Sequence, residues 1–210
     1  MRVAVIGLGL IGGSLGLALR AAGIEVVGYA RRRETASQAV ECGAVDSVEE
    51  DVASAAASGD VVVVSTPVLA VRDVLAAISG SLGEGVIVTD VASTKAEVMR
   101  WARELLPPFV SFIGGHPMAG REHSGIAAAE AGLFRDCTYC LVPGESIAAG
   151  MYERLEGLVR CIGANPLRID AVEHDRLVAG ISHLPLLAAV ALTASTTGSH
   201  LWPSMARLAS

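Results

Sequence analysis

Short, nearly continuous apolar runs alternate along this chain with longer stretches of helical character. The runs at residues 3–6, 25–29, 60–64 and 86–89 are rich in valine and other β-branched residues, a pattern typical of strands buried on both faces. An alanine- and leucine-rich segment with helical periodicity follows the first run and ends near residue 22. This alternation predicts the α/β class, with a doubly wound, mostly parallel sheet.

A glycine-rich turn joins the first predicted strand to the first predicted helix. Gly7 permits a tight turn, Gly9 lets the backbone approach a pyrophosphate, and Gly12 lets the helix pack closely on the strand. The helix N-terminus then offers free N–H groups to phosphate. The turn predicts a Rossmann-like dinucleotide site contacted by Gly7, Leu8, Gly9, Leu10, Ile11 and Gly12.

The end of the second predicted strand bears on which dinucleotide binds. An NAD site usually has an acidic residue there, for the ribose 2′-hydroxyl. This chain has Ala30, followed by Arg31, Arg32 and Arg33, and arginine binds a phosphate group bidentately. The pattern favours NADP over NAD as cofactor, with Arg31 and Arg32 as contacts, although three arginines also suit a solvated turn.

Two further strand ends are expected at the same crevice. In a doubly wound sheet, ligands lie beyond the carboxyl ends of the strands, which places Ser65, Thr66, Pro67 and Asp90 there as cofactor contacts. Ser93 follows closely and has two interpretations. It hydrogen-bonds the substrate or a histidine, or it is the N-cap of a helix over residues 95–106.

That histidine is His116, within a segment of glycine and proline residues at 114–120. Glycine and proline here indicate a turn, so we expect the imidazole to be presented from a loop. An unperturbed imidazole titrates near neutral pH, which suits proton transfer beside a nucleotide site. His116 is therefore a candidate catalytic residue.

The pattern changes near Asp170, which has capping-box spacing with Glu173. A long apolar helical stretch follows over residues 177–193, and we place a domain boundary there, with a nucleotide-binding domain at 1–170 and a partial helical domain at 171–210. Pro185, His183 and the absence of a basic flank argue against a membrane span. A helix this apolar needs a cover, and we expect a partner subunit or a part of the natural protein outside this chain.

Composition narrows the class of partner. Of the 210 residues, 52% are hydrophobic, 18% charged and 4% aromatic, and the formal net charge is −6. This composition is typical of a buried parallel sheet. An acidic chain is a poor match for nucleic acid or an anionic membrane, so we expect a small-molecule partner.

Four cysteines bear on metal binding and location. Cys137 and Cys140 have the spacing of a redox or zinc pair, but they lie in a predicted strand over residues 137–142. Residues three apart on a strand point to opposite faces, which does not suit a shared metal. We therefore expect no metal site. Because residue 1 leads straight into a strand without a secretory signal, we expect reduced thiols and a cytoplasmic location.

Taken together, the motifs GLGLIGGSLGLAL, DVASTK, GGHPMAG with REHSG, and SHLP resemble the prephenate/arogenate dehydrogenases of tyrosine biosynthesis. They occur in the family's order through essentially the whole chain. The resemblance implies an NAD(P)-dependent oxidative decarboxylation of prephenate to 4-hydroxyphenylpyruvate, or of arogenate to tyrosine. It also implies a helical dimerisation domain and a homodimer. The chain stops before the family's arginine-bearing segment, so we expect it to be truncated.

The resemblance also implies roles for particular residues. His116 matches the family's catalytic histidine and Ser93 the serine that hydrogen-bonds with it, while Ser182 and His183 of the SHLP motif are expected near the substrate. Glu122 is expected near the substrate side chain, unless it is simply a surface carboxylate.

One departure from the family concerns substrate choice. Three residues beyond the SHLP histidine, many prephenate-specific members have a second histidine, where this chain has Leu186. The difference favours arogenate or relaxed specificity without deciding between the two substrates.

Two alternatives of other classes remain at this point. One is a different Rossmann reductase acting on a β-hydroxyacid or an imine, although residues 177–193 lack the lysine that such enzymes usually carry. The other is a non-catalytic NADP-binding module, because the helical domain is cut.

Overall fold

The computed structural model describes residues 1–145 and 147–208, and Ala209 and Ser210 at the chain end lie outside that description. Its strands are β1 (Arg2–Ile6), β2 (Glu25–Tyr29), β3 (Ser47–Val48), β4 (Val61–Val64), β5 (Ile87–Asp90), β6 (Ser111–Pro117), β7 (Thr138–Pro143) and β8 (Asn165–Arg168). Its α-helices are α1 (Leu10–Ala21), α2 (Arg33–Glu41), α3 (Val52–Ala57), α4 (Val68–Ile78), α5 (Ala96–Leu105), α6 (Met151–Cys161), α7 (Ala171–Val178), α8 (Leu184–Thr197) and α9 (Trp202–Leu208).

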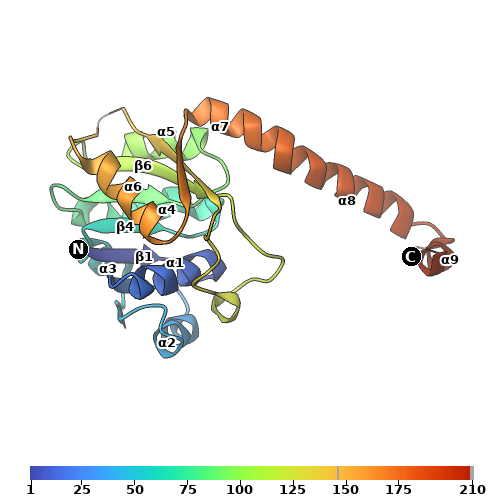
Figure 1. Ribbon diagram of the computed structural model, residues 1–210, viewed down its shortest axis with the longest axis horizontal. Coiled ribbons are helices and arrows are strands. Elements are labelled where there is room, and N and C mark those ends of the chain that lie inside the picture. The colour runs from blue at the N-terminus through green and yellow to red at the C-terminus, as the bar shows by residue number, and fades with distance from the viewer. Residues whose placement is uncertain (146, 209–210) are drawn as a thin grey trace.

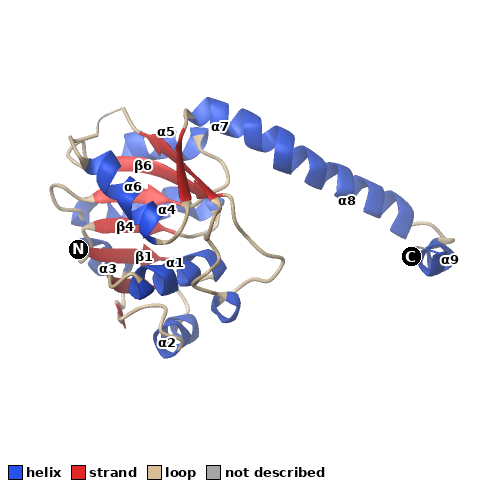
Figure 2. Cartoon of the chain, in the orientation of Figure 1, coloured by secondary structure: helices blue, strands red, loops and turns tan. Residues whose placement is uncertain are grey.

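All eight strands belong to one sheet in the order β3-β2-β1-β4-β5-β6-β7-β8 (Figure 2). Every neighbouring pair is parallel except β6 and β7. The chain order reverses between β1 and β4, so the carboxyl ends of β1, β4, β5 and β6 share one edge of the sheet. The predicted doubly wound, mostly parallel fold is confirmed.

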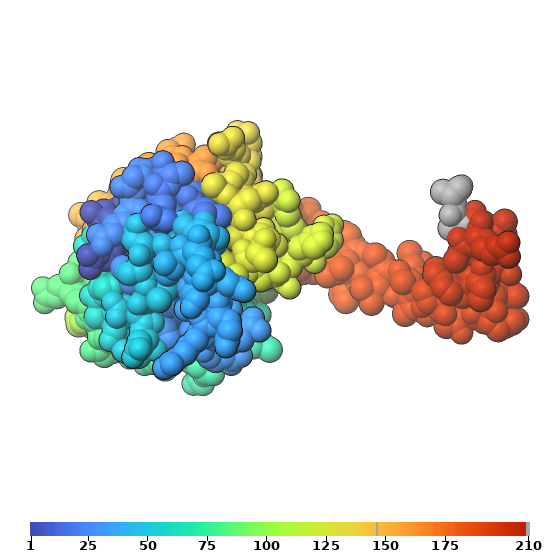
Figure 3. Space-filling view, turned by 90° about the horizontal axis from the view of Figure 1, so that it is seen from below, coloured from blue at the N-terminus to red at the C-terminus, as the bar shows by residue number. Residues whose placement is uncertain are grey.

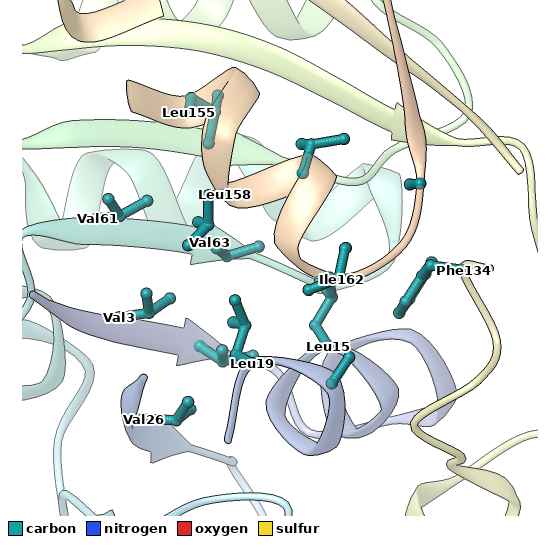
Figure 4. Packing of buried hydrophobic residues seen from close by; sticks show 14 of the residues in the cluster. Val3, Leu15, Leu19, Val26, Val61, Val63, Phe134, Leu155, Leu158 and Ile162 are labelled. Carbon is teal, nitrogen blue, oxygen red and sulfur yellow. The ribbon is translucent and has the colours of Figure 1, made fainter. Parts of the chain in front are cut away.

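The sheet is covered on both faces. On one face, Val3, Val26 and Val63 pack beneath helices α1 and α6, as Figure 4 shows with Leu19 and Leu158. On the other face, helices α3, α4 and α5 cover a second cluster. Both faces of a strand are therefore apolar, which explains why the strands appear in the sequence as unbroken hydrophobic runs.

The segment around His116 is a strand, not the predicted loop. Residues 114–117 belong to β6, and His116 pairs with Cys140 of β7. Glycine is needed here because another part of the backbone comes close, not because the chain turns. A Cβ on Gly115 would lie 2.4 Å from the backbone oxygen of Asp90. The expectation of a loop failed because glycine in a strand also marks a site where another backbone comes near.

The C-terminal segment leaves the body as one helical arm. Helix α7, the π-helical turn η3 (Ala179–His183) and α8 run on continuously, and Figures 1 and 3 show the arm projecting into solvent. Residues 171–197 are long and apolar enough to cross a membrane by length and composition, and only 6% of the most apolar window is buried. This is weak evidence for a span, because core helices of soluble proteins meet the same criterion.

Candidate active site

The glycine turn at the carboxyl end of β1 is shaped for close contact. Gly7 has a φ of +101°, and a Cβ there would lie 2.5 Å from the backbone oxygen of Ser65. A Cβ on Gly12 would lie 1.9 Å from the backbone oxygen of Gly7, so α1 can begin here only with glycine. At Gly9 no described atom lies within 4 Å of a Cβ position. The turn is closed toward the protein and open toward a ligand.

Unpaired hydroxyls face the same turn from the end of β4. The hydroxyl oxygens of Ser65 and Thr66 are buried and have no hydrogen-bond partner among the described residues. Ser65 Oγ lies 3.0 Å from where a Cβ of Gly12 would stand. Buried hydroxyls normally find a partner, so these two suit a polar ligand in the turn, and the exposed Pro67 begins α4 beside them.

The other predicted cofactor contacts differ in how far their side chains are exposed to a ligand. The side chain of Leu8 is 1% exposed and packs in the core, so only its backbone faces the turn. Leu10 and Ile11 are half-buried in the first turn of α1. Arg31 and Arg32 are exposed at the end of β2 and form no ion pair in the described part of the chain. Their guanidinium groups remain available to a phosphate.

A fully buried ion pair joins β5 to β6. The Lys95 ammonium donates to Asp90 Oδ2 and, over 2.6 Å, to the backbone oxygen of Gly115. The Asp90 carboxylate also accepts the N–H groups of Ala92 and Gly115, over 2.8 and 3.1 Å. Burial lowers the pKa of Lys95, and the Asp90 carboxylate opposes that shift. Both side chains are 0% exposed, so the Asp90 carboxylate is engaged within the protein, and the cofactor contact at Asp90 stays a prediction.

Next to this pair, three side chains form a hydrogen-bonded row. His116 Nδ1 lies 2.8 Å from His174 Nε2, and His174 Nδ1 lies 2.8 Å from Asp175 Oδ1. His174 is 1% exposed, whereas His116 is half-buried at the carboxyl end of β6. The row runs from the middle of α7 to an imidazole at the sheet edge that also bears the glycine turn.

His116 is held neutral at physiological pH. Burial is the main cause of its lowered pKa, and Lys95, followed by His174 and His183, lowers it further, to about 4. The Asp175 carboxylate acts in the opposite direction. A neutral imidazole is able to accept a proton at pH 7.

The start of α5 is capped from outside its own sequence. Asp175 accepts the backbone N–H groups of Lys95 and Ala96 at 2.7 and 2.9 Å. Burial acts to raise the pKa of Asp175, but these hydrogen bonds and that from His174 outweigh it and lower the pKa. The interpretation of Ser93 as the N-cap is therefore wrong, because a distant carboxylate fills that role.

Ser93 itself is exposed, and no hydrogen bond joins it to His116 within residues 1–145 and 147–208. His183 lies at the end of η3 and is half-buried, near enough for its charge to lower the pKa of His116. The neighbouring Ser182 is exposed, as is Glu122. The structure thus brings His183 toward His116 and leaves the other three at the surface.

Sequence reasoning missed three functional-site residues: Lys95, His174 and Asp175. The sequence holds one signal for the last two, an adjacent His-Asp pair one turn inside a capped helix. A lysine at the end of DVASTK gives no sign that it will be buried. The π-helical turn before Pro185 was also unexpected, although proline lacks the N–H that a regular helix needs there.

The doubly wound sheet, the glycine turn and the unpaired hydroxyls beside it define a nucleotide-binding domain. Residues 15–166 match the family described as prephenate dehydrogenase, nucleotide-binding domain. The chain belongs to this family, as its motifs predicted. Membership argues against the alternative assignment to a β-hydroxyacid or imine reductase.

Individual relatives agree with this placement. The chain is 35% identical to prephenate dehydrogenase of Bacillus subtilis over 97% of its own length and 56% of that protein. Arogenate dehydrogenase of Synechocystis matches the whole chain with a TM-score of 0.87 and 33% identity, over 75% of that structure. Prephenate dehydrogenase of Aquifex aeolicus, solved with hydroxyphenyl propionate and NAD+, matches 94% of the chain and 69% of that structure. The TM-score is 0.87 and the sequence identity is 28%. The chain spans about half the length of the curated relatives it first matches.

We expect the Asp90–Lys95 pair to be strongly coupled. Asp90→Asn or Lys95→Met alone leaves one buried charge without its partner, which costs about 3–5 kcal/mol of unfolding free energy. The double variant removes both charges and should cost clearly less than the sum of the two. Urea unfolding of the four proteins at pH 7 measures this coupling, and additive losses would contradict it.

Proposed function

We propose that this chain is the nucleotide-binding part of an NAD(P)-dependent dehydrogenase that oxidatively decarboxylates prephenate or arogenate. The observation that carries the proposal is His116, a neutral imidazole at the sheet edge that bears the glycine turn. Family membership supplies the substrate class, and it favours catalysis over a non-catalytic nucleotide-binding module.

The residues suit this chemistry. The substrate is a hydroxylated cyclohexadiene with a ring carboxylate, and the reaction removes a hydride and a hydroxyl proton before carbon dioxide leaves. The nicotinamide ring, when bound, takes up the hydride. His116 accepts the hydroxyl proton, and loss of carbon dioxide makes the ring aromatic, which drives the reaction forward. The glycine turn with Ser65 and Thr66 would hold the dinucleotide, whose nicotinamide would supply the hydride acceptor.

Further substrate contacts are proposed from the same arrangement. His183 faces the region of His116 from η3, and Ser182 precedes it. Ser93 and Glu122 lie on exposed segments on the same side of the strands, where the substrate's polar groups would meet them. Leu186, 62% exposed beyond His183, stands where a second histidine would favour prephenate.

His116→Asn in a form of the protein extended past Ser210 should abolish most turnover. We expect kcat to fall by about 100- to 10,000-fold, because proton acceptance is worth that much, while nucleotide affinity stays unchanged. Turnover of prephenate and of arogenate, with nucleotide titration, measures both. His200→Asn, far along the arm, is the matched control. Near-normal turnover in His116→Asn would refute the assignment.

We infer that the cofactor is NADP. The support is the acid-free end of β2, where Ala30 is followed by the exposed guanidinium groups of Arg31 and Arg32. A 2′-phosphate would lie among these groups, and guanidinium binds phosphate through paired charged hydrogen bonds.

Replacing both Arg31 and Arg32 with alanine should weaken NADP binding by about 10- to 100-fold and leave NAD binding nearly unchanged. Arg72→Ala, which removes an exposed arginine of α4, is the control. Isothermal titration with each nucleotide gives the answer. An equal loss for NAD and NADP, or tighter binding of NAD by the unaltered protein, would overturn the inference.

We also propose that the arm belongs to a second, helical domain starting at residue 171 and that this domain forms a homodimer. The apolar side chains of α8 are exposed along its length, among them Leu184, Leu187 and Leu192 at 64%, 66% and 67%, and a patch of this size needs a cover. A partner subunit, not a lipid bilayer, is the cover that fits a small-molecule enzyme. The four cysteines are free thiols, which suits a cytoplasmic location.

Leu187→Arg in the extended protein should disrupt that dimer, because it places a charge in the buried face of the interface. Sedimentation velocity should show a dimer for the unaltered protein and a smaller or aggregated species for the variant. Leu69→Arg, which changes an 86% exposed leucine of α4, should sediment as a dimer. A monomer in the unaltered protein would contradict the proposal.

A further inference from the structure

Only one ring nitrogen of His116 is free to act on a substrate. Its Nδ1 lies 2.8 Å from His174 Nε2, with the two rings edge to face at 68°. A hydrogen bond between two imidazole nitrogens needs a hydrogen on one and a lone pair on the other. Which of the two carries the hydrogen therefore decides whether His116 Nε2 is a proton acceptor.

The position of this hydrogen is determined by Asp175, which lies on the other side of the His174 ring. Its carboxylate accepts the N–H groups of Lys95 and Ala96, and Oδ1 also lies 2.8 Å from His174 Nδ1. An ionised carboxylate only accepts hydrogen bonds, so His174 Nδ1 carries a hydrogen. In a neutral ring the other nitrogen, Nε2, then has a lone pair and must accept from His116.

We propose that His174 and Asp175 are positioning residues that hold His116 in the Nδ1–H tautomer, so that Nε2 presents its lone pair to the substrate hydroxyl. The inference rests on the proposed function for its catalytic meaning, but the tautomer is a property of the protein alone. It adds two residues that lie outside the four motifs quoted in the sequence analysis.

The row also stabilises His116 after it accepts the proton. The substrate O–H bond breaks and an Nε2–H bond forms, leaving an imidazolium whose Nδ1–H still donates to His174. Asp175 faces this new charge through the His174 ring, whereas Lys95 and His183 oppose it. The carboxylate thus offsets part of the cationic field around His116, much as the buried aspartate does in a serine protease triad.

Both positioning residues come from the helical segment, whereas His116 comes from the sheet. Helix α7 packs on α5, and Asp175 is the group that caps α5. The hydrogen-bonded row that holds His116 is therefore complete only when α7 packs on the nucleotide-binding domain. Displacing α7 would remove the acceptor of His116 Nδ1–H and uncap α5 at the same time.

Nuclear magnetic resonance of 15N-histidine-labelled protein tests the tautomer directly, because protonated and unprotonated ring nitrogens differ widely in 15N shift. The 210-residue chain at pH 7 should show His116 with Nδ1 protonated and Nε2 bare, the signals being assigned by their loss in His116→Asn. A bare Nδ1 with a protonated Nε2 would overturn the proposal whatever the enzyme's activity.

Two variants separate positioning from simple packing. His174→Leu removes the acceptor, so both His116 tautomers should appear and kcat of the extended enzyme should fall about 10- to 1000-fold, with KM and NADP affinity unchanged. His174→Gln supplies an amide oxygen as acceptor. It should restore much of the Nδ1–H tautomer of His116 and much of kcat. His200→Leu is the matched control.

An unchanged His116 tautomer in His174→Leu, or equal kcat losses in the leucine and glutamine variants, would refute the positioning role. If His174→Leu does not fold, the 15N spectra of the unaltered protein and of His174→Gln still test the tautomer. If the unaltered extended protein turns over neither ring substrate, the proposed function fails, while the spectra continue to report which nitrogen of His116 is protonated.

Discussion

The site is organised around the buried ion pair between Asp90 and Lys95. The parallel pairing of β5 and β6 ends at Thr89 with Ile113, and beyond it the pair takes over the connection between the two strands. Such a pair is tolerable only when its remaining donors and acceptors are also satisfied. Here backbone groups of Ala92 and Gly115 supply those extra hydrogen bonds.

The effects of this ion pair extend to both His116 and the helix beside it. Gly115 immediately precedes His116, so the hydrogen bonds to Gly115 determine where the imidazole emerges. Lys95 immediately precedes α5 and brings that helix start to Asp175. The ammonium group also contributes to the lowered pKa of His116. One buried lysine thus connects β6, α5 and His116.

The helical arm shows the opposite situation, an apolar surface without a core. Its first turns are tied to the body through Val178, His174 and Asp175, and beyond η3 every large apolar side chain in the described part of the arm is exposed. The proposed helical domain and homodimer would cover this exposed apolar surface. The same arm carries His183 close enough to affect the pKa of His116, so whatever covers the arm also borders the proposed substrate site.

Much of the fold could be predicted from local patterns, because buried parallel strands require continuous apolar runs and a tight βα turn requires glycine at fixed positions. The boundaries of β2 followed directly, as did the Asp170 cap of α7, and the end of α1 was predicted to within one residue, although its start at Leu10 lies inside the predicted glycine turn. The resemblance of short motifs to one family identified His116 and His183. These features depend on residues that are close together in the sequence, so they can be predicted from a single sequence.

Sequence alone was therefore enough for the fold class, the nucleotide turn and the histidine at the centre of the site. The three-dimensional structure was needed to show that His116 lies in a strand, that Asp90 is paired with Lys95, and that a carboxylate 79 residues away caps α5. It was also needed to pair His116 with His174, 58 residues further along the chain. The physical reason is that a hydrogen bond or an ion pair forms only between groups that are close in space. The local sequence around one partner does not show which distant residue the fold brings next to it.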